Sequence, residues 1–163
     1  MIFLNKTCFN GLWRVNGRGE FNVPVGSYRP DRVRLYDCEN LLAASRALQG
    51  VELAVRDFRE VLREAPSGTF VYLDPPYVPL SATANFTSYT RENFGMAEQE
   101  KLAACFAEAA ERGARLMLSN SDTPAVHHLY RGFTIRKLQA RRAVNCNGSG
   151  RGLIPEALVL SWR

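Results

Sequence analysis

The segment that most constrains the fold is the apolar run at residues 69–73, followed directly by Asp74-Pro75-Pro76-Tyr77. An apolar run of this length, rich in aromatic and β-branched residues, predicts a buried strand. A proline has no N–H to donate and restricts the residue before it to extended conformations, so the strand ladder ends at this pair. The four residues therefore stand at the carboxyl end of a strand, where open α/β sheets place their ligand sites.

The chemistry of these four residues suits an exocyclic amino group on a flat base. Asp74 offers a charged acceptor, which makes the stronger kind of hydrogen bond. Pro75 offers a carbonyl, and Pro76 keeps Pro75 extended so that this carbonyl points at one place. Tyr77 can stack on a base, worth roughly 1–3 kcal/mol. Two acceptors on one amino nitrogen raise its nucleophilicity, which indicates methyl transfer to a nucleobase without a metal; the alternative is a structural Pro-Pro turn with Asp74 as a cap.

Composition restricts the remaining possibilities. The chain has 163 residues, enough for one domain, and a net charge of +5 that favours a nucleic-acid partner. Four widely spaced cysteines without a CxxC motif predict reduced thiols in a cytoplasmic protein, with no zinc site. The sequence has no apolar run long enough to span a membrane and no signal peptide, so we expect no membrane partner.

Periodicity and breaker residues predict the order of elements. Strands alternate with helices from residue 51 onward, which predicts an α/β fold with a mostly parallel sheet closed by an antiparallel pair. Gly113 is the expected end of the most amphipathic helix. The expected helices are 39–49, 58–65, 96–112 and 123–130, and the expected strands are 51–55, 69–73, 115–119, 133–138 and 156–162.

Three other segments are candidates for function rather than for core. The first 30 residues are rich in Asn, Gly and aromatics, and Gly17-Arg18-Gly19 between two β-prone runs predicts a hairpin. Residues 78–94 form a long segment without a periodic pattern, which in a compact domain usually carries function. Residues 141–151 form a basic, Gly-rich loop suited to phosphate.

These features together resemble the DNA adenine N6-methyltransferases of the Dam type, which recognise GATC. The resemblance implies a partial Rossmann-like methyltransferase sheet with a DNA-recognition β-hairpin, duplex DNA as the partner, base flipping, and S-adenosylmethionine as the cofactor. It also implies that residues 1–38 belong to a target-recognition domain and residues 39–163 to the catalytic domain. The matching stretches are Phe3-Leu4-Asn5 to Gly26-Ser27-Tyr28, Tyr72 to Tyr77, Pro79 to Thr87, and Leu118-Ser119-Asn120-Ser121-Asp122.

The same resemblance assigns roles to individual residues. Asp74, Pro75, Pro76 and Tyr77 would form the catalytic pocket. Arg14 is the expected reader of guanine, and Phe9 the expected wedge beside the flipped adenine. Asp57, Phe58 and Asp74 would bind the cofactor, with Asp57 and Phe58 lining its adenine pocket; for Phe58 a core position is an equal alternative. The residues expected to contact or border DNA are Lys6, Phe9, Asn10, Leu12, Arg14, Asn16, Asn22 and Ser81.

The chain departs from the family pattern at its beginning. Dam-type enzymes start with a Gly-rich strand–loop that holds the cofactor's methionine part, and no such loop precedes Met1. The sequence therefore resembles the carboxyl-terminal part of such an enzyme: a truncated gene, one half of a split enzyme with a second polypeptide, or an incomplete reading frame. The alternative functions are a non-catalytic DNA-binding remnant and an amino methyltransferase for RNA or protein glutamine. Mismatch repair, phage protection and restriction–modification all remain open as roles.

Overall fold

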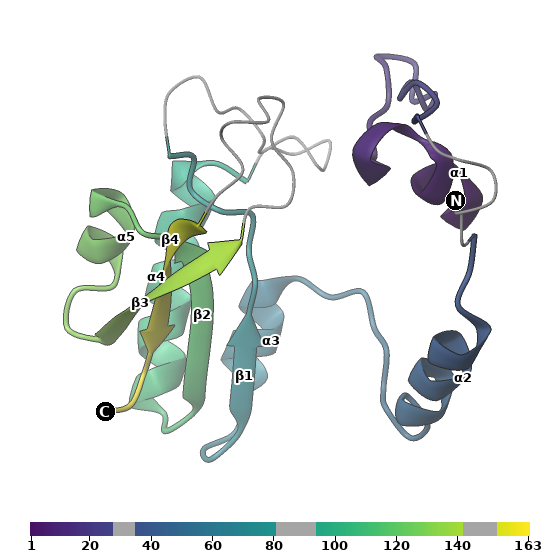
Figure 1. The fold of residues 1–163 in the computed structure, drawn as a ribbon. Helices are drawn as coiled ribbons and strands as arrows, with labels where there is room; N and C mark the ends of the chain where they lie inside the picture. The colour runs from purple at the N-terminus through teal and green to yellow at the C-terminus, as the bar shows by residue number, and fades with distance from the viewer. Residues whose placement is uncertain (28–34, 81–93, 142–152) are drawn as a thin grey trace. The chain divides into compact units, whose positions relative to one another are not determined.

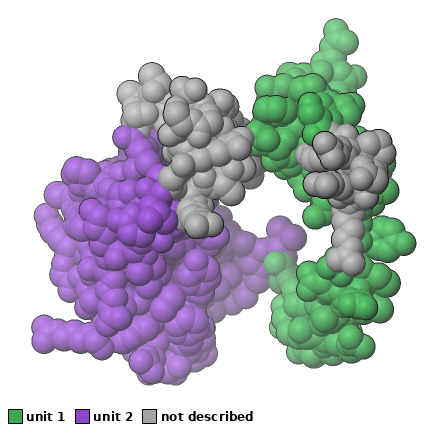
Figure 2. Space-filling model, viewed as in Figure 1, with its two compact units in different colours: residues 1–54 green, residues 55–163 purple. Residues whose placement is uncertain are grey.

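The computed structural model describes residues 1–27, 35–80, 94–141 and 153–163 of the chain. The chain divides into two compact units, Met1–Ala54 and Val55–Arg163 (Figure 2). Each unit is described by itself below. Ser81, most of the 78–94 segment and nearly all of the basic 141–151 loop lie outside the described residues.

The second unit is built on a four-stranded sheet in the order β1-β2-β4-β3 (Figure 1). Its strands are β1 (Phe70–Leu73), β2 (Arg115–Ser121), β3 (Thr134–Arg141) and β4 (Leu153–Leu160). The first two strands pair in parallel, and β4 runs antiparallel to both β2 and β3. The α/β class and the antiparallel closing pair are confirmed. Of the three pairings among the described strands, β1 with β2 is parallel and the other two are antiparallel. A mostly parallel, Rossmann-like sheet therefore remains a prediction.

Helices cover the face of the sheet that carries Val71, Leu116 and Leu118. These helices are α3 (Phe58–Glu64), α4 (Met96–Glu111) and α5 (Pro124–Leu129), and Figure 1 shows α3 and α4 behind the sheet. Local sequence fixes where two of them begin: the side chains of Asp57 and Thr123 accept hydrogen bonds from backbone N–H groups in the first turns of α3 and α5. The expected helices in this region are confirmed within a few residues.

The core of the second unit lies between this sheet face and α4. The apolar periodicity of α4 predicts Leu102, Ala103, Phe106 and Ala110 as its core-facing residues; the first three are buried, Ala110 is partly buried against the core, and Ala109 is fully buried. The ring of Phe106 packs edge-on against that of Tyr130, with ring centroids 5.3 Å apart. Such burial of apolar surface is the main term that stabilises the unit.

The turn after α4 depends on Gly113, as expected from the sequence. Gly113 has a φ of +92°, and a Cβ at this position would lie 2.5 Å from the Ser67 hydroxyl oxygen. Gly132 has a similar φ of +98° but nothing within 4 Å of the equivalent Cβ position. The two glycines therefore share the same backbone requirement and differ in the neighbouring side chain.

We predict that Gly113→Ala lowers the free energy of unfolding more than Gly132→Ala does. Both substitutions force a left-handed conformation on an L-residue, at about 1–2 kcal/mol, and only Gly113→Ala adds the contact with Ser67. Urea unfolding of the two variants would measure the difference. Adding Ser67→Gly to the Gly113→Ala variant should remove the difference, and equal losses in the two single variants would contradict the prediction.

The first unit contains α1 (Ile2–Thr7), the short 3₁₀ helix η1 (Phe9–Gly11) and α2 (Cys38–Ala47). The helix predicted at 39–49 is confirmed as α2, whereas α1 lies in the Asn- and Gly-rich segment, where the sequence predicts a hairpin and no helix. Residues 8–25 are held by two isolated antiparallel bridges, Cys8 to Val25 and Val15 to Phe21. The chain turns between the partners of the second bridge, but no extended strand forms in residues 1–27, so the recognition hairpin remains a prediction.

The strand predicted at residues 51–55 is wrong. This segment has no regular secondary structure, and the side chain of Leu53 is 75 % exposed. A strand needs a neighbouring strand to satisfy its backbone N–H and C=O groups, and no described residue pairs with this segment. Alternating apolar residues were therefore not sufficient to define a strand here.

Candidate functional site

The Asp74-Pro75-Pro76-Tyr77 turn lies at the carboxyl edge of the parallel strand pair. β1 ends at Leu73, which pairs with Leu118 of β2. Because side chains alternate between the faces of a strand, Leu118 and Asn120 point to the helix-covered face and Ser119 points to the opposite one. Ser119 and Asn120, which follow Leu118 in β2, can therefore contact the turn from opposite faces of the sheet.

On the face away from the helices, Ser119 orients the carboxylate of Asp74. The Ser119 Oγ donates to Asp74 Oδ1 at 3.0 Å and lies 2.9 Å from the Tyr72 hydroxyl oxygen. A serine hydroxyl has a single proton, so when it is donated to Asp74 the Tyr72 hydroxyl must donate to Ser119. Asp74 is exposed, and its second oxygen, Oδ2, has no hydrogen-bond partner among the described residues. One oxygen is thus fixed while the other is available to an incoming N–H group.

The Pro75 carbonyl is a second available acceptor beside Asp74. It accepts no hydrogen bond from the described residues, whereas the next carbonyl, that of Pro76, accepts from Gln99 Nε2 at 2.7 Å. Pro75 is half-buried. The turn therefore carries a carboxylate and a neutral carbonyl acceptor on successive residues, and their use by an amino group remains a prediction.

Tyr77 adds a half-buried aromatic ring to this group. Burial raises the pKa of its phenol, and the nearby carboxylates of Glu156 and Asp74 act in the same direction. The Ser119 hydroxyl opposes the shift without cancelling it. The phenol therefore stays neutral at physiological pH, which is the state suited to stacking on an uncharged base.

Two buried side-chain amides hold the turn from the helix-covered face. Gln99 of α4 is 2 % exposed and Asn120 of β2 is fully buried. Asn120 Nδ2 donates to Gln99 Oε1 at 3.2 Å, and Asn120 Oδ1 accepts from the backbone N–H of Val78 at 2.8 Å. Sequence reasoning gave neither amide a role, although Gln99 lies one turn before Leu102 and Ala103 in the apolar stripe of α4. A polar residue inside such a stripe was the available signal.

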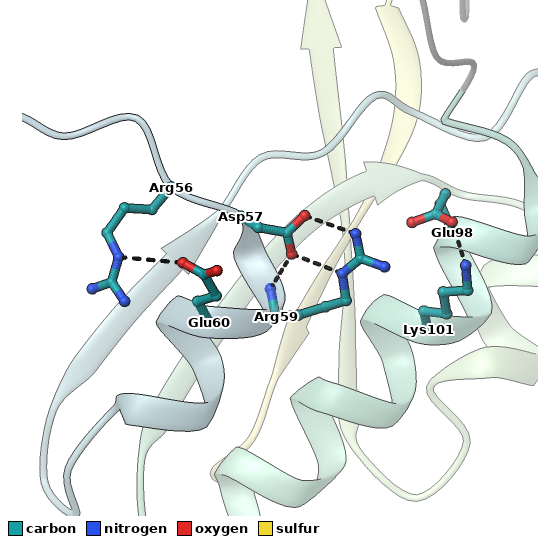
Figure 3. A network of polar contacts seen from close by, with 6 residues as sticks. All are labelled: Arg56, Asp57, Arg59, Glu60, Glu98 and Lys101. Atoms are coloured by element: carbon teal, nitrogen blue, oxygen red, sulfur yellow. Dashed lines mark hydrogen bonds and ion pairs between the residues drawn. The ribbon is translucent and has the colours of Figure 1, made fainter.

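Asp57 and Phe58, the residues expected to line the cofactor pocket, both have protein partners; Figure 3 shows those of Asp57. Asp57 caps α3, and its two oxygens accept from Arg59 Nε and Nη2, each at 2.8 Å. The hydrogen bond from the Arg59 side chain, followed by that from its backbone N–H, lowers the pKa of Asp57 to about 2. Phe58 packs against the core, with its ring 5.9 Å from that of Phe94. A cofactor role for the two residues stays a prediction.

Most of the residues expected to bind DNA lie in the first unit. Arg14 donates from Nε to Asn22 Oδ1 at 2.8 Å and from Nη2 to the Asn22 carbonyl at 3.0 Å. Asn16 accepts from the backbone N–H groups of Arg18 and Glu20, so it stabilises the turn itself. Lys6, Phe9, Asn10 and Arg14 are exposed and Leu12 is half-buried. The structure thus brings Arg14 and Asn22 together, and the DNA contacts themselves remain predictions.

Among the described residues, no three potential metal ligands lie close enough together to hold an ion. None of the described helices is both long and apolar enough to cross a membrane.

The fold and the turn together define an α/β protein with a polar site at the carboxyl ends of a parallel strand pair. The chain belongs to the family of D12 class N6 adenine-specific DNA methyltransferases, whose profile matches residues 1–144.

Comparison with curated relatives agrees with this family. The chain is 46 % identical over 163 residues to the type II methyltransferase M.MjaIII of Methanocaldococcus jannaschii, covering 99 % of this chain and 56 % of the relative. It is 39 % identical over 164 residues to M1.LlaDCHI of Lactococcus lactis subsp. cremoris, covering 99 % and 57 %. It is 38 % identical over 160 residues to a DNA adenine methylase of Vibrio cholerae, covering 98 % and 57 %. The chain spans a little over half the length of these relatives.

Proposed function

We propose that this chain carries the adenine-binding site and part of the DNA-recognition surface of a methyltransferase that modifies N6 of adenine in duplex DNA, at GATC. The observation that carries the proposal is the pair of available acceptors, Asp74 Oδ2 and the Pro75 carbonyl, on successive residues at the carboxyl edge of β1. The family and the names of its relatives support the substrate and the reaction.

The proposed mechanism uses each group of the turn for one purpose. A flipped adenine presents two N–H bonds on its amino nitrogen, and Asp74 and the Pro75 carbonyl each accept one. This raises the electron density on nitrogen, which is otherwise delocalised into the ring, and holds it in one position. Tyr77 stacks on the base and offsets part of the few kcal/mol that flipping costs. Because Asp74 accepts one of these N–H bonds, it is the group placed to take the proton that the amino nitrogen must lose on methylation.

S-adenosylmethionine, the cofactor we propose, supplies an electrophilic methyl group when bound. Asp57 and Phe58 are the residues that would hold its adenine end. The geometry of Asp57 is compatible with this use, because its Oδ2 accepts one hydrogen bond from Arg59 and retains an acceptor position for a further N–H group. Calorimetry with S-adenosylmethionine and this chain tests the assignment. Heat of binding that is lost in Asp57→Ala supports it, and binding to a GATC duplex without any cofactor binding would favour a DNA-binding remnant.

Sequence discrimination tests the DNA part of the proposal. We predict that Arg14→Ala reduces the preference for a GATC duplex over an AATT duplex, which keeps the central A·T pairs and lacks both guanines, by about 1–3 kcal/mol, because a bidentate guanine contact is lost. Fluorescence anisotropy at a fixed salt concentration would measure both affinities.

Arg18→Ala is the matched control, since Arg18 lies on the same exposed segment and loses the same charge. Arg18→Ala should leave the GATC preference intact and at most weaken binding to both duplexes equally. If Arg14→Ala instead weakens both duplexes to the same extent, Arg14 contacts the phosphate backbone and the guanine assignment is wrong.

A further inference from the structure

We propose that Gln99 and Asn120 are positioning residues for the methyl transfer, because they hold the two peptide groups on either side of Tyr77. This inference rests on the proposed function, and it assigns a role to two side chains that do not reach the base themselves. Both are buried on the helix-covered face of the sheet, away from the exposed carboxylate of Asp74.

The hydrogen bonds form one continuous chain around Tyr77. Gln99 Nε2 donates to the Pro76 carbonyl, which belongs to the peptide group before Tyr77. Asn120 Oδ1 accepts from the Val78 N–H, which belongs to the peptide group after Tyr77. Asn120 Nδ2 then donates to Gln99 Oε1 and closes the connection between the two. The planes of both peptide groups are therefore fixed, and with them the backbone dihedral angles of Tyr77.

The orientation of each amide is determined by its partners. An amide oxygen can only accept and an amide nitrogen can only donate. Asn120 Oδ1 also accepts from the Ser121 N–H at 2.8 Å, so two donors face this oxygen and its nitrogen must face Gln99. Gln99 must then present its oxygen to Asn120 and its nitrogen to Pro76. Neither amide can rotate by 180° without placing like groups against each other.

Burial makes this chain of contacts a strict requirement. Each buried amide lowers stability by about 1–3 kcal/mol if it lacks a hydrogen-bond partner. A leucine or methionine at position 99 carries no such cost and would stabilise the unit by burying apolar surface beside Leu102. Stability alone therefore does not call for two amides here. A stacking platform does, because the Tyr77 ring and the neighbouring Pro75 carbonyl must keep their direction while a base enters and leaves.

Amide hydrogen exchange measured by NMR tests whether the chain of contacts exists. In the wild-type protein, the Val78 backbone amide and the Asn120 side-chain amide should exchange slowly, while the side-chain amide of the exposed Gln139 exchanges freely. In Gln99→Met, which keeps the volume and removes both hydrogen bonds, exchange at Val78 should accelerate by about tenfold, the factor that corresponds to 1.4 kcal/mol. Fast exchange at Val78 in the wild-type protein would overturn the proposal without any substitution.

A duplex with 2-aminopurine in place of the target adenine tests whether the contacts position the base. Wild-type protein should raise the fluorescence of this base in GATC, because the base leaves the stack. Gln99→Met should bind the duplex with unchanged affinity and lose most of the rise, and the matched Gln139→Met variant should behave as wild type. A wild-type chain that causes no rise would overturn the proposed function, whereas a full rise in Gln99→Met would overturn the positioning role alone.

Discussion

Replacing Asp74 by alanine is expected to reduce methyl transfer by about 10²–10³-fold or more, the effect of removing one preorganised hydrogen-bonding group from an active site. The substitution removes the charged acceptor and leaves the Pro75 carbonyl as the sole partner of the amino group. Asp74 belongs to the second unit, whereas the exposed basic residues to which we assign DNA binding belong to the first. Binding to a GATC duplex should therefore persist, and incorporation of labelled methyl groups in the complete enzyme is the measurement.

Two comparison variants make this prediction specific. Asp74→Asn keeps one neutral acceptor oxygen, so its activity should fall between those of wild type and Asp74→Ala. Glu111→Ala removes a carboxylate of the same charge from the exposed carboxyl-terminal end of α4 and should leave methyl transfer unchanged. Turnover in Asp74→Ala close to that of wild type would show that this carboxylate is not the acceptor, and the proposed mechanism would fail with it.

The parts of the fold that the sequence predicted well are those with strong local signals. The apolar stripe of α4 and the glycine after it defined that helix to within a residue or two. The two prolines after residue 73 defined the end of β1. In contrast, residues 51–55 show the alternation of a strand without forming one, because alternation describes which side chains could be buried and not whether a partner strand is present.

The candidate site was predictable to the extent that its chemistry is contiguous in the sequence. Asp74 and Pro75 provide adjacent acceptors because they are neighbours in the chain, and this could be inferred from the residues alone. The supports of the turn could not: Ser119 lies 45 residues from Asp74, and Gln99 lies 23 residues from Pro76. Their contacts follow from the pairing of β1 with β2 and the packing of α4, which only the three-dimensional structure provides.

The helix that carries Gln99 is itself held by one large aromatic side chain, so core stability and turn geometry are linked. Phe106 is fully buried, and its ring packs edge-on against both Tyr130 and Phe133, with centroids 5.3 and 5.0 Å away. We predict that Phe106→Ala lowers the free energy of unfolding of the second unit by about 3–5 kcal/mol, through lost apolar burial and the cavity that remains. Urea unfolding followed by circular dichroism would measure this loss.

The matched control is Phe70→Ala, which removes the same side chain from a position that is 57 % exposed, where the ring makes an edge contact with that of Trp162. It should cost far less than Phe106→Ala, and comparable losses would contradict the burial argument. Domains of this kind have about 5–15 kcal/mol of total stability, so the expected loss in Phe106→Ala is a large fraction of it.

Because α4 carries Gln99, hydrogen exchange at Val78 should accelerate in Phe106→Ala through global opening of the unit. In Gln99→Met, exchange at Val78 should accelerate through local opening of the turn. Backbone amides in the middle of β2 should therefore exchange faster in Phe106→Ala and keep their wild-type rates in Gln99→Met.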